Sequence, residues 1–278
     1  MTGPLVAAGC LLLAYATVIM VAIPPVVTRR RWTSRFPRTA LLLWIGALGS
    51  GAVALLASLG CAIGAATTLS EQQHRQVTLH HVLDGIGLTV TACLMTAVGG
   101  GVICAMLYHA VVAATSRHRL RTAVALAATT ADEGRRGRAG ARRTSTLVVH
   151  STEASAVSVP GRSPVIVISS RLRETLTPAQ LDAVVEHERG HLLQRHHLLL
   201  HLADLQYRCL PVLPSARALE RSVHLLVEFA ADDHAAHRCG RATTAAALRA
   251  LGEANGDPGL RLRASRLERR LGRPTEAA

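Results

Sequence analysis

Three long segments of this chain carry no charged side chain, and they constrain its fold more than any other feature. Residues 1–28, 39–70 and 85–116 contain no Asp, Glu, Lys or Arg. Each segment is longer than the roughly 20 apolar residues that an α-helix needs to cross a bilayer. The sequence therefore predicts a mainly α membrane protein with a membrane domain over residues 1–115. The three predicted transmembrane helices span residues 5–27, 40–66 and 88–114.

The arginines between these segments predict the orientation of the chain in the membrane. Five arginines follow the first predicted helix, only Arg75 follows the second, and the basic linker 116–144 after the third is rich in arginine. Loops with an excess of Lys and Arg stay in the cytoplasm. We therefore expect a multi-pass protein with its N-terminus outside and everything after the third helix in the cytoplasm. The same arginines can contact anionic lipid headgroups.

Two short motifs in the second half of the chain carry metal-binding chemistry. The first is H-E-x-x-H, in which His187 and His191 flank Glu188. Residues four apart on a helix lie on one face, so both imidazoles can bind one metal ion. The second motif is E-x-x-x-D, which places Glu228 and Asp232 on one face of a later helix.

Together the motifs predict a catalytic zinc site. A catalytic zinc takes three protein ligands and keeps a fourth position for water. His187, His191 and Glu228 supply two nitrogens and an oxygen, and Glu188 can take a proton from the water. Asp232 can hydrogen-bond a ligand histidine without touching the metal itself. The alternative interpretation is that these are ordinary solvated charges on two amphipathic helices.

The H-E-x-x-H motif lies in a predicted helix with a clear start. Thr177-Pro178-Ala179-Gln180 is a capping box with proline at the first helical position. No proline follows before Pro211, so we expect this helix to extend past the motif into residues 192–213. The extension carries three histidines that we expect to be solvated or to lie at the membrane interface: His196, His197 and His201.

Residues 145–169 have a β-prone composition. The runs 145–150, Ala156–Val159 and 164–168 predict a sheet of two or three strands that leads into the motif helix. Pro164 predicts an edge position for the third strand, because proline cannot donate to a strand ladder. An exposed strand edge beside the zinc could bind an extended peptide by strand addition.

The remainder of the chain is predicted to be helical. A helix over 215–238 carries the second motif, and two short amphipathic helices are expected over 243–251 and 260–271. We assign residues 145–240 to a metallopeptidase domain and residues 241–278 to a helical tail, in which we expect no chemistry.

Charge and cysteine content exclude other classes of function. The net charge of +13 is compatible with nucleic-acid binding, but aromatic residues, which stack on bases, make up only 3% of the chain. We therefore expect no direct nucleic-acid binding. Of the six cysteines, four lie in the predicted membrane helices, and none forms a C-x-x-C pair. They predict neither a disulfide framework nor a cysteine zinc site.

The motifs in their setting resemble a known family. The runs L-T-P-A-Q-L-D-A-V-V-E-H-E-R-G-H and L-V-E-F-A-A-D-D follow membrane helices and Val- and Ile-rich strands. This arrangement resembles the BlaR/MecR-type membrane zinc metallopeptidases of bacteria in a short form, with the HtpX-like membrane proteases as wider relatives. Over residues 145–240 the resemblance includes specific motifs. Over the membrane helices it is limited to their general arrangement. It implies a cytoplasmic α+β zincin-like domain on the bacterial plasma membrane.

The resemblance also implies residue roles. One zinc ion per chain would be bound by His187, His191 and Glu228, with Glu188 as general base and Asp232 as a supporting carboxylate. In related enzymes a basic residue after the second motif supports the oxyanion. The candidates for that role are His234, His237 and Arg238.

The protein substrate implied by the resemblance is a winged-helix transcriptional repressor of the BlaI/MecI type, cleaved in signal transduction. No extracellular penicillin-binding domain is expected, because the sequence has no room for one, and the involvement of β-lactam antibiotics is left open. Two alternatives are a broad quality-control protease for membrane proteins and a non-catalytic signalling scaffold stabilised by zinc.

Overall fold

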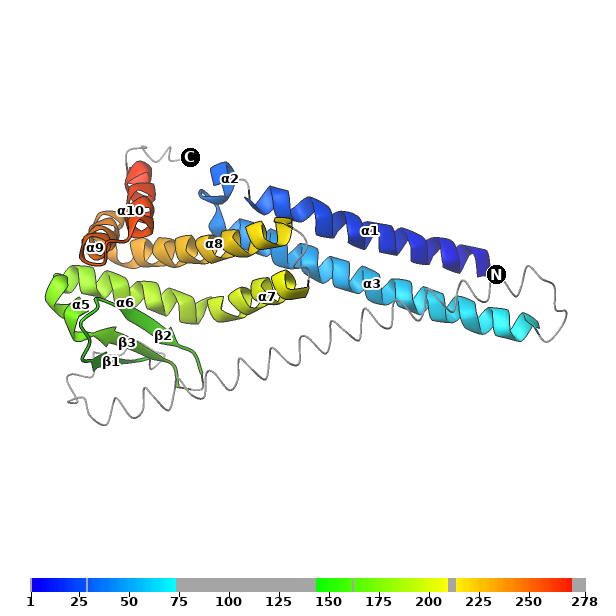
Figure 1. The fold of residues 1–278 in the computed structure, drawn as a ribbon, viewed down its shortest axis with the longest axis horizontal. Helices are drawn as coiled ribbons and strands as arrows, with labels where there is room; N and C mark the ends of the chain where they lie inside the picture. Colours follow the sequence, from blue (N-terminus) through cyan, green and yellow to red (C-terminus); the bar gives the residue numbers. More distant parts are fainter. Residues whose placement is uncertain (1, 29, 74–143, 162, 210–213, 272–278) are drawn as a thin grey trace. The chain divides into compact units, whose positions relative to one another are not determined.

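The computed structural model describes residues 2–28, 30–73, 144–161, 163–209 and 214–271, shown in Figure 1. The chain divides into two units, each described by itself below. The first unit comprises Met1–Thr33, Thr39–Ala110 and Leu205–Leu219, and the second comprises Ser34–Arg38, Val111–Asp204 and Glu220–Ala278.

The first unit contains two long apolar helices, α1 (Thr2–Thr28) and α3 (Pro37–Gln73), with the short helix α2 (Arg30–Thr33) between them. The segments Gly3–Thr28 and Pro37–Ala65, with mean hydropathies of 2.4 and 2.1, are long and apolar enough to cross a membrane. Two of the three predicted membrane helices therefore coincide with helices of suitable length and composition. The third, 88–114, lies outside the described residues.

Polar side chains join the two long helices. Tyr15 donates a hydrogen bond from its hydroxyl to Ser50 Oγ at 3.2 Å, and Ser58 Oγ donates to the Gly9 carbonyl at 2.9 Å. A Cβ at Gly9 would lie 3.4 Å from the Cβ of Cys61, so the glycine allows a close approach. Small residues permit such contacts between apolar helices.

The second unit begins with a three-stranded mixed sheet of β1 (Ser145–Val149), β2 (Ala156–Val159) and β3 (Val165–Ser169). The strand order is β1-β3-β2, with β1 parallel and β2 antiparallel to β3. The strands were predicted nearly in place, but the edge position predicted from Pro164 is wrong. Because Pro164 precedes β3, its missing N–H interrupts no ladder, and β3 is the central strand.

The core of this unit lies between the sheet and three helices: α5 (Ser170–Thr175), α6 (Pro178–Leu193) and α9 (Arg241–Ala254). Ile166 from β3 and Leu172 from α5 are fully buried. Ala183 and Val184 on α6 and Leu251 on α9 belong to the same cluster. This packing fixes α6, which carries the H-E-x-x-H motif, against the sheet.

The start of α6 confirms the predicted capping box. The backbone N–H of Gln180 donates to Thr177 Oγ1 at 3.4 Å, and the backbone N–H of Thr177 donates to Gln180 Oε1 at 2.9 Å. Each bond satisfies a donor that the first helical turn leaves unpaired.

The predicted extension of this helix through residues 192–213 is wrong. Helix α6 ends at Leu193, and a separate helix, α7 (His196–Cys209), begins after a two-residue turn. Arg195 in this turn has φ = 52°, a left-handed conformation that no α-helix can continue. The turn consists of Gln194 and Arg195, neither of which is a typical helix-breaking residue, so the sequence pattern does not indicate it.

Besides α9, the described part of the second unit contains α10 (Pro258–Leu271) and most of α8 (Pro214–Cys239). Their bounds agree with the predicted helices to within a few residues. In Figure 1, α6 lies between the sheet and α8. A Cβ at Gly190 on α6 would lie 3.2 Å from the Cβ of His234 on α8, so the two helices approach each other closely at the motif.

Candidate metal centre

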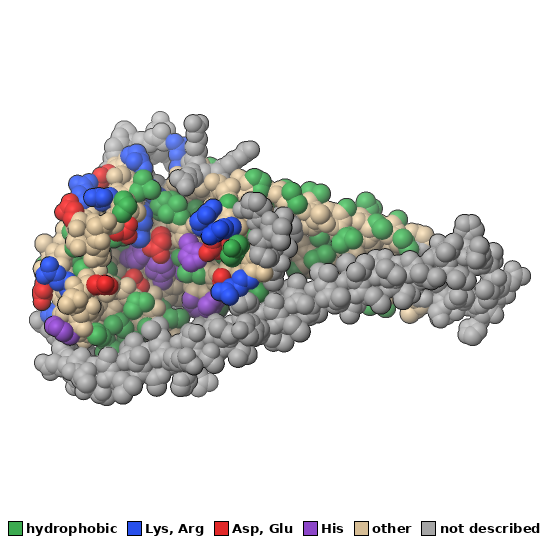
Figure 2. Space-filling view, in the orientation of Figure 1, with side chains coloured by type: hydrophobic (Ala, Val, Ile, Leu, Met, Phe, Trp, Pro, Cys, Tyr) green, Lys and Arg blue, Asp and Glu red, His purple; other side chains and the backbone are tan. Residues whose placement is uncertain are grey.

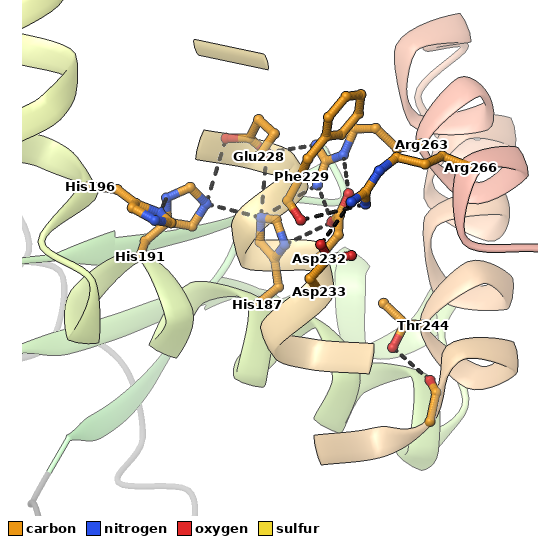
Figure 3. Close-up of polar contacts among 11 residues, drawn as sticks. His187, His191, His196, Glu228, Phe229, Asp232, Asp233, Thr244, Arg263 and Arg266 are labelled. Carbon is orange, nitrogen blue, oxygen red and sulfur yellow. Dashed lines mark hydrogen bonds and ion pairs between the residues drawn. The ribbon is translucent and has the colours of Figure 1, made fainter. Parts of the chain in front are cut away.

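Two helices bring three possible metal ligands together, as Figure 3 shows. His187 and His191 extend from α6, and Glu228 extends from α8. The Nε2 atoms of the two histidines lie 3.0 Å apart. Glu228 Oε2 lies 3.4 Å from His187 Nε2, and Oε1 lies 3.5 Å from His191 Nε2. Because the ligand atoms all lie within 4.8 Å of one another, one metal ion could contact all three.

This group is open to solvent on its carboxylate side. The side chains of His187 and His191 are 12% and 15% exposed, whereas that of Glu228 is 35% exposed. Figure 2 shows histidine side chains beside acidic and basic ones on this face of the second unit. A metal ion held here would therefore be accessible to water or to a substrate.

Asp232 contacts the outer nitrogen of the first histidine. Its Oδ1 lies 3.0 Å from His187 Nδ1, and its side chain is 0% exposed. A carboxylate at this nitrogen fixes the tautomer with a proton on Nδ1 and leaves the Nε2 lone pair free for a metal. The structure thus places Asp232 where the spacing of the second motif predicted it.

A further residue, Arg263 on α10, contacts both carboxylates of the second motif. Its Nε and Nη2 donate to Asp232 at 2.9 Å and 2.6 Å, and Nη1 lies 2.7 Å from Glu228 Oε2. Nη2 also lies 3.5 Å from His187 Nε2. Sequence patterns do not distinguish Arg263, because it lies outside both motifs among several other arginines of the predicted tail.

These contacts determine the charges of the group. Burial alone lowers the pKa of His187, but the carboxylates of Asp232 and Glu228 outweigh it and raise the pKa to about 9. Burial opposes ionisation of Glu228, yet His187 and Arg263 lower its pKa to about 2. Asp232 is likewise held well below its ordinary pKa, chiefly by Arg263 against the effect of burial. Both carboxylates are therefore ionised at neutral pH.

Glu188 follows His187 on α6 and is half-buried. Its negative charge acts on the His191 ring and favours protonation there. Burial and the neighbouring His187 have the larger effects and lower the pKa of His191. The structure therefore places an ionisable carboxylate close to the possible metal ligands, as the H-E-x-x-H spacing predicted.

His196 is neither solvated nor interfacial, contrary to prediction. His196 is only 1% exposed, and its Nδ1 lies 3.1 Å from His191 Nδ1. The two rings meet edge to face, with centroids 4.8 Å apart and planes at 86°. Burial, reinforced by His191, lowers the pKa of His196 to about 3, so the ring is neutral. The prediction failed because it assumed an unbroken helix, on which His196 would lie on another face.

The structure does not bring the three basic candidates for oxyanion support to this group. His234 Nε2 and Arg238 Nε instead lie 3.5 Å and 3.8 Å from Glu186 Oε2. His237 is exposed. Arg263 reaches the group instead, through Glu228 and Asp232.

The donor set of this group fits a metal such as zinc. Two imidazole nitrogens and one carboxylate, all with lone pairs directed into the same space, match the ligands of catalytic zinc sites. The outer nitrogens of both histidines have a polar neighbour, Asp232 for His187 and His196 for His191. A metal cation at this position would take the place of the proton that the raised pKa of His187 indicates in the metal-free protein.

Comparison with known proteins also indicates a metallopeptidase for part of the chain. Residues 137–216 match the model of peptidase family M48. This match supports a zinc metallopeptidase. The matched segment includes the H-E-x-x-H motif but ends before Glu228, Asp232 and Arg263, which are joined to it only by the fold. Searches of curated proteins and of solved structures returned no match.

Proposed function

We propose that this protein is a membrane-anchored zinc endopeptidase. The observation that carries the proposal is the convergence of His187 Nε2, His191 Nε2 and the Glu228 carboxylate next to Glu188. The exposed side of Glu228 supports catalysis over a purely structural site, because structural zinc sites are closed by four protein ligands.

In the proposed mechanism His187, His191 and Glu228 hold one zinc ion. The ion, when bound, lowers the pKa of a water to about 7 and polarises the scissile carbonyl. Glu188 accepts the proton of the attacking water and donates it to the leaving amine. Asp232 keeps the proton of His187 on Nδ1, and Arg263 compensates the two carboxylates of α8, so that neither is an unpaired charge.

We propose that the substrate binds as an extended peptide along β2. Within the described part of the sheet β2 is an outer strand, and it packs against α6, which carries the motif. Val157 on this strand is 46% exposed. Backbone hydrogen bonds to such an edge hold a peptide without selecting its sequence.

We propose that the site faces the cytoplasm of a bacterial cell. Arg266 on α10 donates from Nε to the carbonyl of Ser34 at 2.8 Å, and its Nη2 lies 2.7 Å from Asp233 Oδ2. Ser34 belongs to the basic loop between the two candidate membrane helices. The metal group and this loop therefore lie on the same side of any membrane that α1 and α3 cross, and a basic loop favours the cytoplasmic side.

A cytoplasmic site narrows the choice of substrate. Together with the resemblance to BlaR/MecR-type peptidases, it supports a winged-helix repressor of the BlaI/MecI type as the protein that is cleaved. Cleavage of such a repressor would connect this enzyme to signal transduction.

The proposed function is tested on the purified full chain in detergent, by zinc content and by cleavage of a winged-helix repressor encoded by the same genome. We expect one zinc per chain in wild type and in Glu188→Gln, with cleavage only in wild type. Glu174→Gln, a substitution on the exposed face of α5, is the matched control and should cleave like wild type. Absence of zinc from the wild-type protein, or cleavage by Glu188→Gln at the wild-type rate, would refute the proposal.

A further inference from the structure

The two histidines of the H-E-x-x-H motif have different partners at their outer nitrogens. Nδ1 of His187 faces Asp232, which is paired with Arg263. Nδ1 of His191 faces Nδ1 of His196 at 3.1 Å. The motif spacing explains the first arrangement, but nothing in the motif explains the second.

The turn after α6 creates the second contact. Helix α6 ends at Leu193, and the backbone N–H of Gln194 still donates to the Gly190 carbonyl at 3.0 Å. Arg195 then takes a left-handed conformation and α7 begins at His196. On a continuous helix the side chains at i and i+5 diverge by about 140°. The turn is therefore what brings His196 back to His191.

The protonation pattern of the pair follows from geometry. If His191 binds a metal through Nε2, its proton is on Nδ1, and that N–H points at His196 Nδ1. His196 must then accept through Nδ1 and carry its own proton on Nε2. Nε2 of His196 is buried with no hydrogen-bond partner among the residues that the structure describes. Within that part of the chain, the polar contact of this ring is with His191.

We propose that His196 is a positioning residue for the metal site, which holds His191 in the tautomer and ring orientation needed for binding through Nε2. This inference rests on the proposed function, because it assigns to His191 a metal that His187 and Glu228 share. It extends the site from α6 and α8 onto α7. Partners of this kind typically change metal affinity by about 10- to 100-fold when they are removed.

The test compares zinc affinity of purified full-length variants, measured by competition with a chelator. His196→Leu replaces the ring with an apolar side chain of similar size and removes the acceptor. His196→Asn keeps an acceptor, because asparagine Oδ1 lies near the position of histidine Nδ1. His201→Leu is the control, because His201 is exposed on the same helix. The absorption spectrum of the cobalt-substituted protein gives a second readout of ligand geometry.

We expect His196→Leu to bind zinc about 10- to 100-fold more weakly than wild type and to alter the cobalt spectrum. His196→Asn should recover most of the affinity, and His201→Leu should match wild type. Unchanged affinity in His196→Leu, or equal losses in the Leu and Asn variants, would overturn the inference while leaving the proposed function intact. A wild-type protein without zinc would refute the proposed function itself, and this inference with it.

Discussion

At the scale of single residues, Arg263 is the side chain on which the metal group most depends. It makes hydrogen bonds to both oxygens of the fully buried Asp232 and an ion pair to Glu228. Two carboxylates one helical turn apart repel each other, and a buried one is costly unless it is paired. The Arg263 guanidinium on α10 pairs with both carboxylates, because its planar N–H groups match the geometry of a carboxylate.

Replacing Arg263 should therefore destabilise the protein strongly. We expect Arg263→Gln to lower the free energy of unfolding by about 3–5 kcal/mol, because it leaves Asp232 buried and unpaired. Arg263→Lys should lose less stability, since it keeps the charge but not the bidentate geometry. Thermal unfolding of the detergent-solubilised variants measures the effect, with the exposed Arg269→Gln on the same helix as control. Equal stability of the Arg263→Gln and Arg269→Gln variants would contradict this account.

The charge state of His187 predicts how the zinc-free protein responds to pH. Its pKa is raised from 6.5 to about 9 in the folded chain, which corresponds to roughly 3 kcal/mol. That stabilisation is complete below pH 6.5 and is lost as the pH rises through 9. The pKa of Glu228 is about 2, so this carboxylate does not titrate in that window.

We therefore expect the melting temperature of chelator-treated protein to fall between pH 6.5 and 9. His187→Gln should lack this part of the decline. If the melting temperatures of wild type and His187→Gln fell in parallel over this pH range, His187 would not be protonated as described.

The pairing of the possible metal ligands within each motif could be predicted because each motif is local. His187 with His191, and Glu228 with Asp232, are four residues apart, and helix geometry alone places each pair on one face. Arg263 and His196 were not predictable in this way. The position of Arg263 depends on how α10 packs beside α8, and that of His196 depends on one backbone dihedral angle.

At the scale of elements, the break between α6 and α7 is the feature that shapes the site. The sequence signals for helix ends are proline and glycine, and the turn at 194–195 contains neither. For β3 a sequence signal was present but misleading. Pro164 predicted an edge strand, but it precedes the strand and does not belong to it. Both errors concern one residue at an element boundary, where a shift of one position changes what a residue implies.

Substitutions at Arg195 test the importance of this turn. Its φ of 52° is unfavourable for a residue with a Cβ, and more so for a β-branched one. We expect Arg195→Val to lower the free energy of unfolding by about 1–2 kcal/mol, whereas Arg195→Gly should cause no loss because glycine adopts this conformation readily. Urea or thermal unfolding of both variants gives the comparison. A valine variant as stable as the glycine variant would mean that the left-handed turn is absent.

At the scale of the whole molecule, the chain combines apolar helices with a folded unit that carries the metal group. The segment Ser34–Arg38, which follows α2 and includes the first two residues of α3, belongs to that second unit, and Arg266 donates to its backbone at Ser34. Hydropathy and arginine placement could predict membrane helices and an orientation. They could not predict this contact, since its partners are more than 200 residues apart.

The contact between Arg266 and Ser34 predicts part of the membrane topology. A reporter inserted directly after Ser34, between α2 and α3, and a reporter fused after residue 278 should lie on the same side of the membrane, and arginine placement makes that side the cytoplasm. Fluorescent-protein fusions, which fold in the cytoplasm, and secreted-phosphatase fusions, which are active outside it, measure this directly. Reporters on opposite sides would exclude the Arg266–Ser34 contact in a membrane-spanning protein.

The most direct test of the central claim is X-ray absorption at the zinc edge of the purified full chain, wild type beside Glu228→Gln. The account predicts a four-coordinate zinc with two imidazole nitrogens and two oxygens at about 2.0–2.2 Å, with a changed oxygen shell in the variant. Sulfur scattering at about 2.3 Å, or a zinc environment that is the same in both proteins, would contradict it.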